Sequence, residues 1–146
     1  MGRIRVAGIV KMPDGYGFMH RKNVKNREYE DYYVFPGGGL EENETLEECI
    51  IREIEEEFGI QVKVIRKVYE TKIEKLNQTE YFYLVEYVSG KFGTGTGPEF
   101  KNDPKYIDSG EFIPEIIKKE NIKDLFLIPT SIKEQFISDL EKGEFD

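Results

Sequence analysis

Residues 45–58 constrain the fold most, because their two ends and their apolar spacing together predict one helix. Thr45 and Glu48 have the spacing of a capping box, in which each side chain bonds the backbone N–H of the other residue. Gly59 follows the last turn, where glycine commonly ends a helix. The apolar positions recur every three or four residues on one face: Leu46, Cys49, Ile50, Ile54 and Phe58. A second layer of structure must cover that face.

The segments around this helix predict strands. They lie at residues 3–11, 15–22, 31–35, 62–75, 79–88 and 111–113. The strands at 62–75 and 79–88 are expected to form a long antiparallel hairpin with its turn at residues 76–78. We expect the strand at 31–35 to stop at the glycines 37–39, and a short helical turn to form at 115–120. A last helix is predicted from Ser131 to about residue 142, with Ser131 and Glu134 as a second capping box. This order of elements predicts the α/β class (an α+β mixed sheet) with helices packed on its faces.

The length and composition favour one globular domain over residues 1–146, because 38% of the residues are apolar. No run approaches the 18 uncharged apolar residues of a membrane span. The N-terminus superficially resembles a signal peptide, but Arg5 and Lys11 interrupt the apolar run, which favours a first strand. Cys49 is the only cysteine, so no intrachain disulfide can form and a reducing cytoplasm is the expected location.

The net charge of −8 is concentrated in one stretch. Residues 41–57 hold nine Glu and one Arg, and the rest of the chain holds 20 acidic and 20 basic residues. Solubility alone would spread the excess over the surface, so this concentration needs a local cause. It also argues against duplex nucleic acid as a partner, because such a surface needs a basic stripe.

Three of these acids continue the apolar stripe of the helix. Glu53, Glu56 and Glu57 lie at positions i, i+3 and i+4, at the edge of the face that should be buried. Each like-charge neighbour costs about 0.2–0.5 kcal/mol even when exposed. A hard cation such as Mg²⁺ or Mn²⁺, which takes oxygen ligands, would relieve that repulsion. The alternatives are an ordinary solvated face and a purely structural acidic helix that binds Ca²⁺.

Residues 38–60 read GGLEENETLEECIIREIEEEFGI and match the Nudix box, G-x5-E-x7-R-E-U-x-E-E-x-G-U, at every specified position. The matching positions are Gly38, Glu44, Arg52, Glu53, Ile54, Glu56, Glu57, Gly59 and Ile60. The chain therefore resembles Nudix hydrolases, in particular the small single-domain members of the MutT group. The resemblance implies a Nudix-type α/β/α sandwich in which the box forms a loop–helix–loop.

The resemblance also implies an activity, the Mg²⁺-dependent hydrolysis of a pyrophosphate bond in a nucleoside diphosphate linked to another moiety. The substrate would be a nucleoside triphosphate or a nucleotide sugar, attacked at phosphorus by a metal-activated water. The alternative is a Nudix-fold module that senses a nucleotide without cleaving it. The expected partner is a small nucleotide, with no membrane, and the chain would be a monomer or a homodimer.

Residue roles follow from the same resemblance. Glu53, Glu56 and Glu57 would bind Mg²⁺ (or Mn²⁺) with the backbone carbonyl of Gly37, and Arg52 would orient the carboxylates. Glu44 would brace the loop, and Gly38 would contact the substrate. Gly59 would be a turn residue. Glu99 would be a further metal ligand or a plain surface residue, and the general base would be Glu53, Glu56 or Glu99.

Outside the box the sequence is less specific. Arg21 would hold a phosphate or lie on the surface, and His20 is expected to be structural. Base stacking would fall to one of several aromatic residues: Phe35, Tyr16, Tyr32, Tyr33 or Tyr83. The glycines of residues 93–97 are expected to form a flexible lid. Family members that clean oxidised guanine nucleotides read the base with an Asn near the last helix, and residues 129–131 have none.

Overall fold

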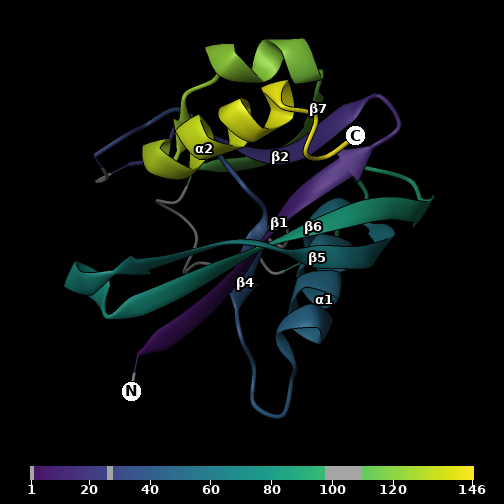
Figure 1. Cartoon of the computed structure of the whole chain (residues 1–146). Helices are drawn as coiled ribbons and strands as arrows, with labels where there is room; N and C mark the ends of the chain where they lie inside the picture. Colours follow the sequence, from purple (N-terminus) through teal and green to yellow (C-terminus); the bar gives the residue numbers. More distant parts are fainter. Residues whose placement is uncertain (1, 26–27, 98–109) are drawn as a thin grey trace.

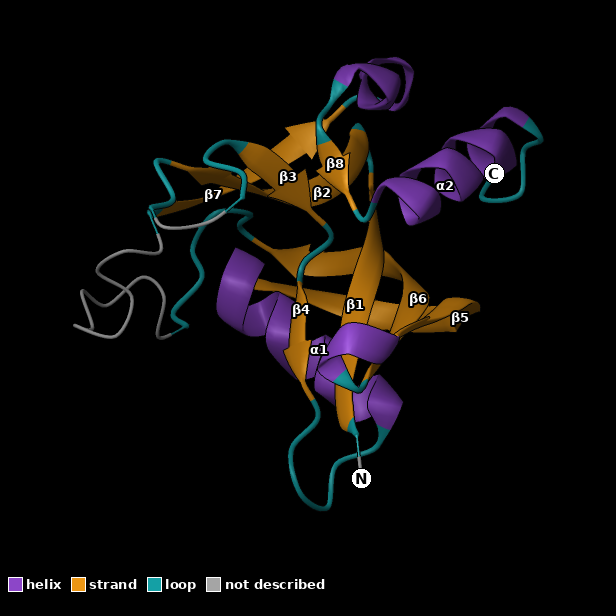
Figure 2. Cartoon of the chain, turned by 90° about the vertical axis from the view of Figure 1, so that its left-hand side faces the viewer, coloured by secondary structure: helices purple, strands orange, loops and turns teal. Residues whose placement is uncertain are grey.

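The computed structural model describes residues 2–25, 28–97 and 110–146, which form a mixed sheet with α-helices on both faces (Figures 1 and 2). The strands are β1 (Arg3–Met12), β2 (Gly15–Lys22), β3 (Tyr32–Val34), β4 (Gly37–Gly39), β5 (Ile60–Ile73), β6 (Gln78–Gly90), β7 (Glu111–Ile117) and β8 (Leu127–Ile128). The helices are α1 (Leu46–Phe58), α2 (Thr130–Glu141) and two short 3₁₀ turns, η1 (Glu74–Leu76) and η4 (Lys119–Asp124). The expected mixed sheet with helices is confirmed.

Strand β1 is the centre of the sheet, whose strand order is β5-β6-β1-β2-β3-β8. One edge of β1 pairs in parallel with β6. The other edge pairs antiparallel with β2 near Met12 and with β4 around Val6. The long hairpin of β5 and β6 was expected, and Asn77 closes it in the left-handed conformation at φ 48°.

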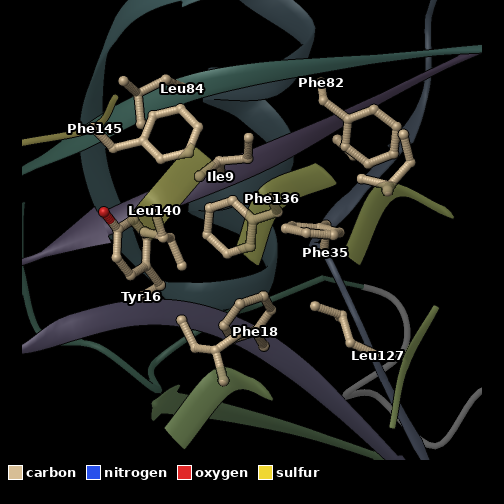
Figure 3. Packing of buried hydrophobic residues seen from close by; sticks show 13 residues of the cluster. Ile9, Tyr16, Phe18, Phe35, Phe82, Leu84, Leu127, Phe136, Leu140 and Phe145 are labelled. Carbon is tan, nitrogen blue, oxygen red and sulfur yellow. The ribbon is translucent and has the colours of Figure 1, made fainter. Parts of the chain in front are cut away.

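The two faces of β1 build two separate cores, because successive side chains of a strand point in opposite directions. Val6 and Val10 face α1 and pack with its buried residues, which are Cys49, Ile50, Ile54 and Phe58. Ala7 and Ile9 face α2 and join an aromatic cluster (Figure 3). In that cluster the Phe136 ring lies 5.5 Å from Phe35, centroid to centroid. The sheet is thus enclosed by α1 on one face and α2 on the other.

Four local expectations differ from the structure. The glycines 37–39 do not merely end a strand but form β4, which pairs with β1. Strand β7 continues to Ile117 because it pairs along most of β2, so the helical turn appears at Lys119–Asp124 instead of 115–120. The second capping box is absent, since α2 begins at Thr130 after Pro129 and its N-cap residue makes no side-chain hydrogen bond. The two-residue strand β8 was not expected.

No helix in the described part of the chain is long and apolar enough to cross a membrane.

Candidate active site

Helix α1 is fixed at both ends as its sequence predicts. The Glu48 backbone N–H donates to Thr45 Oγ1 at 3.1 Å, and the Thr45 N–H donates to Glu48 Oε1 at 2.9 Å. Gly59 ends the helix at φ 75°, and its N–H donates to the Glu55 carbonyl at 2.9 Å. These caps set the register of the carboxylates along the helix.

The three acids of the stripe lie between the core and the solvent. Glu57 is buried, with 9% of its surface exposed, which a solvated face does not predict. The Glu53 side chain is 14% exposed and the Glu56 side chain 38%. Glu48 and Glu55, on the other side of the helix, are exposed. The carboxylates of the stripe therefore lie along one margin of α1, where water is partly excluded.

Arg52 connects the carboxylates to one another. Its guanidinium donates two bonds to Glu44, from Nε at 2.6 Å and from Nη2 at 3.0 Å. Nη1 donates to Glu53 at 2.8 Å and to Glu56 at 3.2 Å. The Arg52 hydrogen bonds hold the pKa of Glu44 at about 2, and the same contacts raise the pKa of Arg52. This geometry supports the expected roles of Arg52 in orienting the carboxylates and of Glu44 in bracing the loop.

Gly38 allows Glu53 to reach the backbone of β4. A Cβ atom on Gly38 would lie 2.4 Å from Glu53 Oε1 and 2.5 Å from its carboxyl carbon. Gly38 is placed there by its pairing with Val6 of β1. The box glycine is therefore needed for close approach of a carboxylate, and not only for a turn.

The backbone of Gly37 faces away from β1. The bonds from Gly8 N–H to the Pro36 carbonyl and from Leu40 N–H to the Ile4 carbonyl identify the bonded pairs of the β1–β4 ladder. Bonded pairs alternate in antiparallel strands, so the polar groups of Gly37 and Gly39 point to the opposite edge of β4. The Gly39 carbonyl accepts from Arg52 Nη2 at 3.3 Å there. The same alternation predicts that the Gly37 carbonyl points to this edge, on the side of the carboxylates.

The chemistry of these donors fits a hard divalent cation. Three carboxylates and one backbone carbonyl supply only oxygen, which Mg²⁺ and Mn²⁺ prefer. Within residues 2–25, 28–97 and 110–146, no three Asp, Glu, His or Cys side chains already converge on one point. Instead, Arg52 provides the positive charge beside Glu53 and Glu56.

Arg21 and His20, which were both predicted outside the box, lie on β2. The Arg21 guanidinium stacks on Phe112, 3.7 Å from its ring centroid, and lies 5.9 Å from that of Tyr32. His20 lies on the opposite face, with Nδ1 2.5 Å from Glu115 and Nε2 2.6 Å from Asp31. The His20 contacts tie β2 to β7 and to the loop before β3, as a structural residue would.

The structure does not support stacking of a base on Phe35. Its ring is 2% exposed and packs in the α2 core beside Phe18, Phe82 and Phe136 (Figure 3). Tyr16 and Tyr83 are buried as well. Tyr32 and Tyr33 are partly exposed, and the Tyr33 ring is stacked on His20 with its centroid 4.1 Å away. Glu99 lies outside the described residues.

The contact of residues 93–97 with the end of α1 was not expected from the sequence. The N–H groups of Gly93 and Gly97 donate to the carbonyls of Phe58 and Glu56, both at 2.9 Å. In this structure the residues that were expected to form a flexible lid are hydrogen-bonded to the end of α1. The one available signal was the lack of a basic residue in the last turn of α1, where it would have bonded the free carbonyls.

Comparison with known proteins agrees with this fold. The model of the NUDIX domain matches residues 2–121. The chain is 31% identical over 116 residues to an 8-oxo-dGTP diphosphatase of Haemophilus influenzae, covering 74% of this chain and 81% of that protein. Its fold is similar to that of a NUDIX hydrolase from Nitrosomonas europaea, with a TM-score of 0.71 and 15% identity over 97% of this chain and 71% of the other. A MutT structure from work on Aliivibrio salmonicida and Vibrio cholerae gives a TM-score of 0.64 and 20% identity, covering 93% of this chain and 96% of the other. The chain therefore belongs to the Nudix family, in its MutT-like group, and is a hydrolase of phosphorus-containing anhydrides.

Proposed function

We propose that this hydrolase uses Mg²⁺ to cleave the pyrophosphate bond of a nucleoside triphosphate or a nucleotide sugar. The observation that carries the proposal is the packing of the Glu53 carboxylate against Gly38, on the margin of α1 that also holds Glu56 and Glu57. This arrangement puts anionic oxygens beside a strand of bare backbone, where a diphosphate can approach closely. Mn²⁺ is expected to substitute for Mg²⁺.

In this proposal Glu53, Glu56, Glu57 and the Gly37 carbonyl hold the metal. When bound, a divalent metal neutralises phosphate oxygens and lowers the pKa of water. Arg52 keeps Glu44 and Glu53 in place through hydrogen bonds of 2.6–3.0 Å. The contact of Gly38 with the substrate is proposed on the family resemblance alone, because the Glu53 carboxylate fills the space of a side chain at this position.

A carboxylate must also accept the proton of the attacking water. Glu53 and Glu56 are candidates, because each lies on the proposed metal-binding margin and is oriented by a hydrogen bond from Arg52. Glu99 remains a candidate as base or ligand on the family resemblance alone. For Arg21 we propose phosphate binding, with its stacking on Phe112 limiting the orientations of the guanidinium.

The nucleobase of the substrate is a separate question from the metal site. The Haemophilus relative acts on 8-oxo-dGTP, but residues 129–131 of this chain, at the start of α2, contain no Asn. We therefore expect 8-oxo-dGTP to be a poor substrate. The single-domain organisation, the cytoplasmic location and the monomeric or homodimeric state stay predictions of the sequence.

A substrate panel with Mg²⁺ tests the function, with phosphate, pyrophosphate and nucleotide products measured by mass spectrometry. Turnover should stop on chelation with EDTA and in the Glu53→Gln and Glu57→Gln variants. Glu55→Gln is the matched control, because Glu55 lies on the same helix but is exposed on its other side, and this variant should keep full activity. Undiminished turnover in Glu53→Gln would contradict the proposal. Tight nucleotide binding without products would favour the sensing module instead.

A further inference from the structure

We infer that residues 93–97 are a positioning element of the hydrolytic site, whose backbone clamps the last turn of α1 and so fixes Glu56 and Glu57. The inference rests on the proposed function, because it concerns the carboxylates that would hold the metal. Residues 93–97 are called the clamp below. They lie between β6 and the segment that leads to β7.

The clamp binds the carbonyl groups that a helix leaves without partners at its C-terminus. The Phe58 carbonyl accepts from the N–H of Gly93 at 2.9 Å and of Thr94 at 3.3 Å. The Glu56 carbonyl accepts from the Gly97 N–H at 2.9 Å. The last turn of α1 contains no basic side chain that would serve the same purpose. The clamp, which is distant in sequence, thus adds to the local cap that Gly59 provides.

The clamp and α1 approach closely enough that side chains are excluded between them. A Cβ atom on Gly95 would lie 2.4 Å from the Glu56 carbonyl oxygen and 2.5 Å from that of Glu57. From the other side, a Cβ on Gly59 would lie 2.1 Å from Thr94 Oγ1. The first two atoms are backbone and cannot move aside as a flexible side chain can. Glycine is therefore needed at position 95 for reasons of space.

An aromatic contact holds the clamp from its N-terminal side. The ring centroid of Phe92 lies 4.6 Å from that of Phe58, which is completely buried. Phe92 directly precedes the clamp, so packing of its partly buried ring against Phe58 keeps Gly93 next to the end of α1. Hydrogen bonds, close packing and an aromatic pair therefore act at the same turn.

This fastening matters because the two carboxylates lie where helices normally fray. Glu57 is the penultimate residue of α1, and the ends of helices are their least ordered parts. Glu53, one turn earlier, is held independently by Arg52 and by its contact with Gly38. Glu56 and Glu57 gain their fixed backbone from the clamp. Their side chains can share a cation with Glu53 only if this backbone is held in place.

The Gly95→Ala variant tests the inference through Mn²⁺ binding without substrate, measured by electron paramagnetic resonance. We expect the Mn²⁺ dissociation constant to rise about 10–100-fold, as on loss of supporting contacts around metal ligands. In turnover assays kcat should fall, and the Mg²⁺ concentration needed for half the maximal rate should rise. Gly143→Ala is the matched control. Gly143 has φ 76° at the end of α2, so alanine there strains the chain without touching α1.

Comparison of the two variants separates positioning from stability. Both should lower the melting temperature, but only Gly95→Ala should weaken Mn²⁺ binding. Equal Mn²⁺ affinity in folded Gly95→Ala and wild type would overturn the inference while leaving the proposed function intact. Absence of turnover in the wild type would instead refute the proposed function.

Hydrogen exchange in the wild type is a test that needs no variant. The amides of Gly93 and Gly97 should exchange slowly, because they donate to the Phe58 and Glu56 carbonyls. If both amides exchanged at the rate of an unstructured peptide, the inference would also be overturned.

Discussion

Arg52→Gln should destabilise the protein strongly, because a single guanidinium bonds three carboxylates. Arg52 donates to Glu44, Glu53 and Glu56 at 2.6–3.2 Å, and its own side chain is 26% exposed. The Glu44 and Glu53 side chains are 13% and 14% exposed. Gln at position 52 removes the positive charge and most of the N–H donors. The negatively charged Glu44, Glu53 and Glu56 are then left next to one another without a cation between them.

The expected magnitude follows from the degree of burial. Two unit charges 4 Å apart interact by about 4 kcal/mol at an effective dielectric constant near 20. Truncation of a buried ion pair costs about 3–5 kcal/mol, while exposed pairs contribute about 0–1 kcal/mol. The exposure of Arg52 lies between these two cases, and two of the carboxylates that it bonds, Glu44 and Glu53, are mostly buried. We therefore expect the free energy of unfolding at pH 7 to fall by about 3 kcal/mol.

The lowered pKa of Glu44 predicts how the loss of stability in Arg52→Gln changes with pH. The pKa of Glu44 is lowered from 4.5 to about 2 in the folded protein, and hydrogen bonding by Arg52 is the main cause. The stability linked to Glu44 is thus complete above pH 4.5 and is lost as the pH falls toward 2. Urea unfolding of wild type and variant should show a difference that narrows between pH 5 and pH 3. A difference below 1 kcal/mol at pH 7, or one that stays constant with pH, would refute the reasoning.

Three further predictions use other contacts. Thr45→Ala removes the capping box and should cost about 1 kcal/mol of unfolding free energy in urea, with normal activity per folded molecule; loss of activity without loss of stability would contradict this. Gly38→Ala should retain its circular dichroism spectrum but lose turnover and Mn²⁺ binding, because the new Cβ would meet Glu53 at 2.4 Å; an active variant would disprove the close approach. Phe136→Ala should cost about 3–5 kcal/mol in thermal or urea unfolding, since its completely buried ring fills the centre of the α2 core; a change below 1 kcal/mol would show that the core can collapse around the gap.

The parts of the fold that the sequence predicted well are those decided by neighbouring residues. The capping box of Thr45 and Glu48 and the left-handed Gly59 involve groups within four residues of one another. The same holds for Asn77, which closes the β5–β6 hairpin. Helix α2 shows the limit of such signals: Ser131 and Glu134 have the spacing of a capping box, yet the helix starts one residue earlier, after Pro129.

The features that could not be predicted depend on partners distant in sequence. Three glycines have little intrinsic tendency to form a strand, and β4 exists because β1 offers its free edge to residues 37–39. The clamp likewise depends on carbonyls about 40 residues earlier, at Glu56 and Phe58. Phe35 was proposed for base binding because aromatic rings suit that task, but ring chemistry does not distinguish a binding face from a core.

The charge balance of the box gives a physical reason for a metal requirement. Glu44, Glu53, Glu56 and Glu57 carry four negative charges, and Arg52, their single neighbouring cation in the box, already donates to three of them. A nucleoside triphosphate is itself a polyanion, so these carboxylates would repel it. The repulsion is about 1–4 kcal/mol for each pair of charges 4 Å apart. Divalent cations reverse the sign of this interaction, because they bind carboxylates and phosphates together. Substrate affinity should therefore depend on the metal concentration even before chemistry begins, and an enzyme that bound its nucleotide equally well in EDTA would be recognising it somewhere other than at these carboxylates.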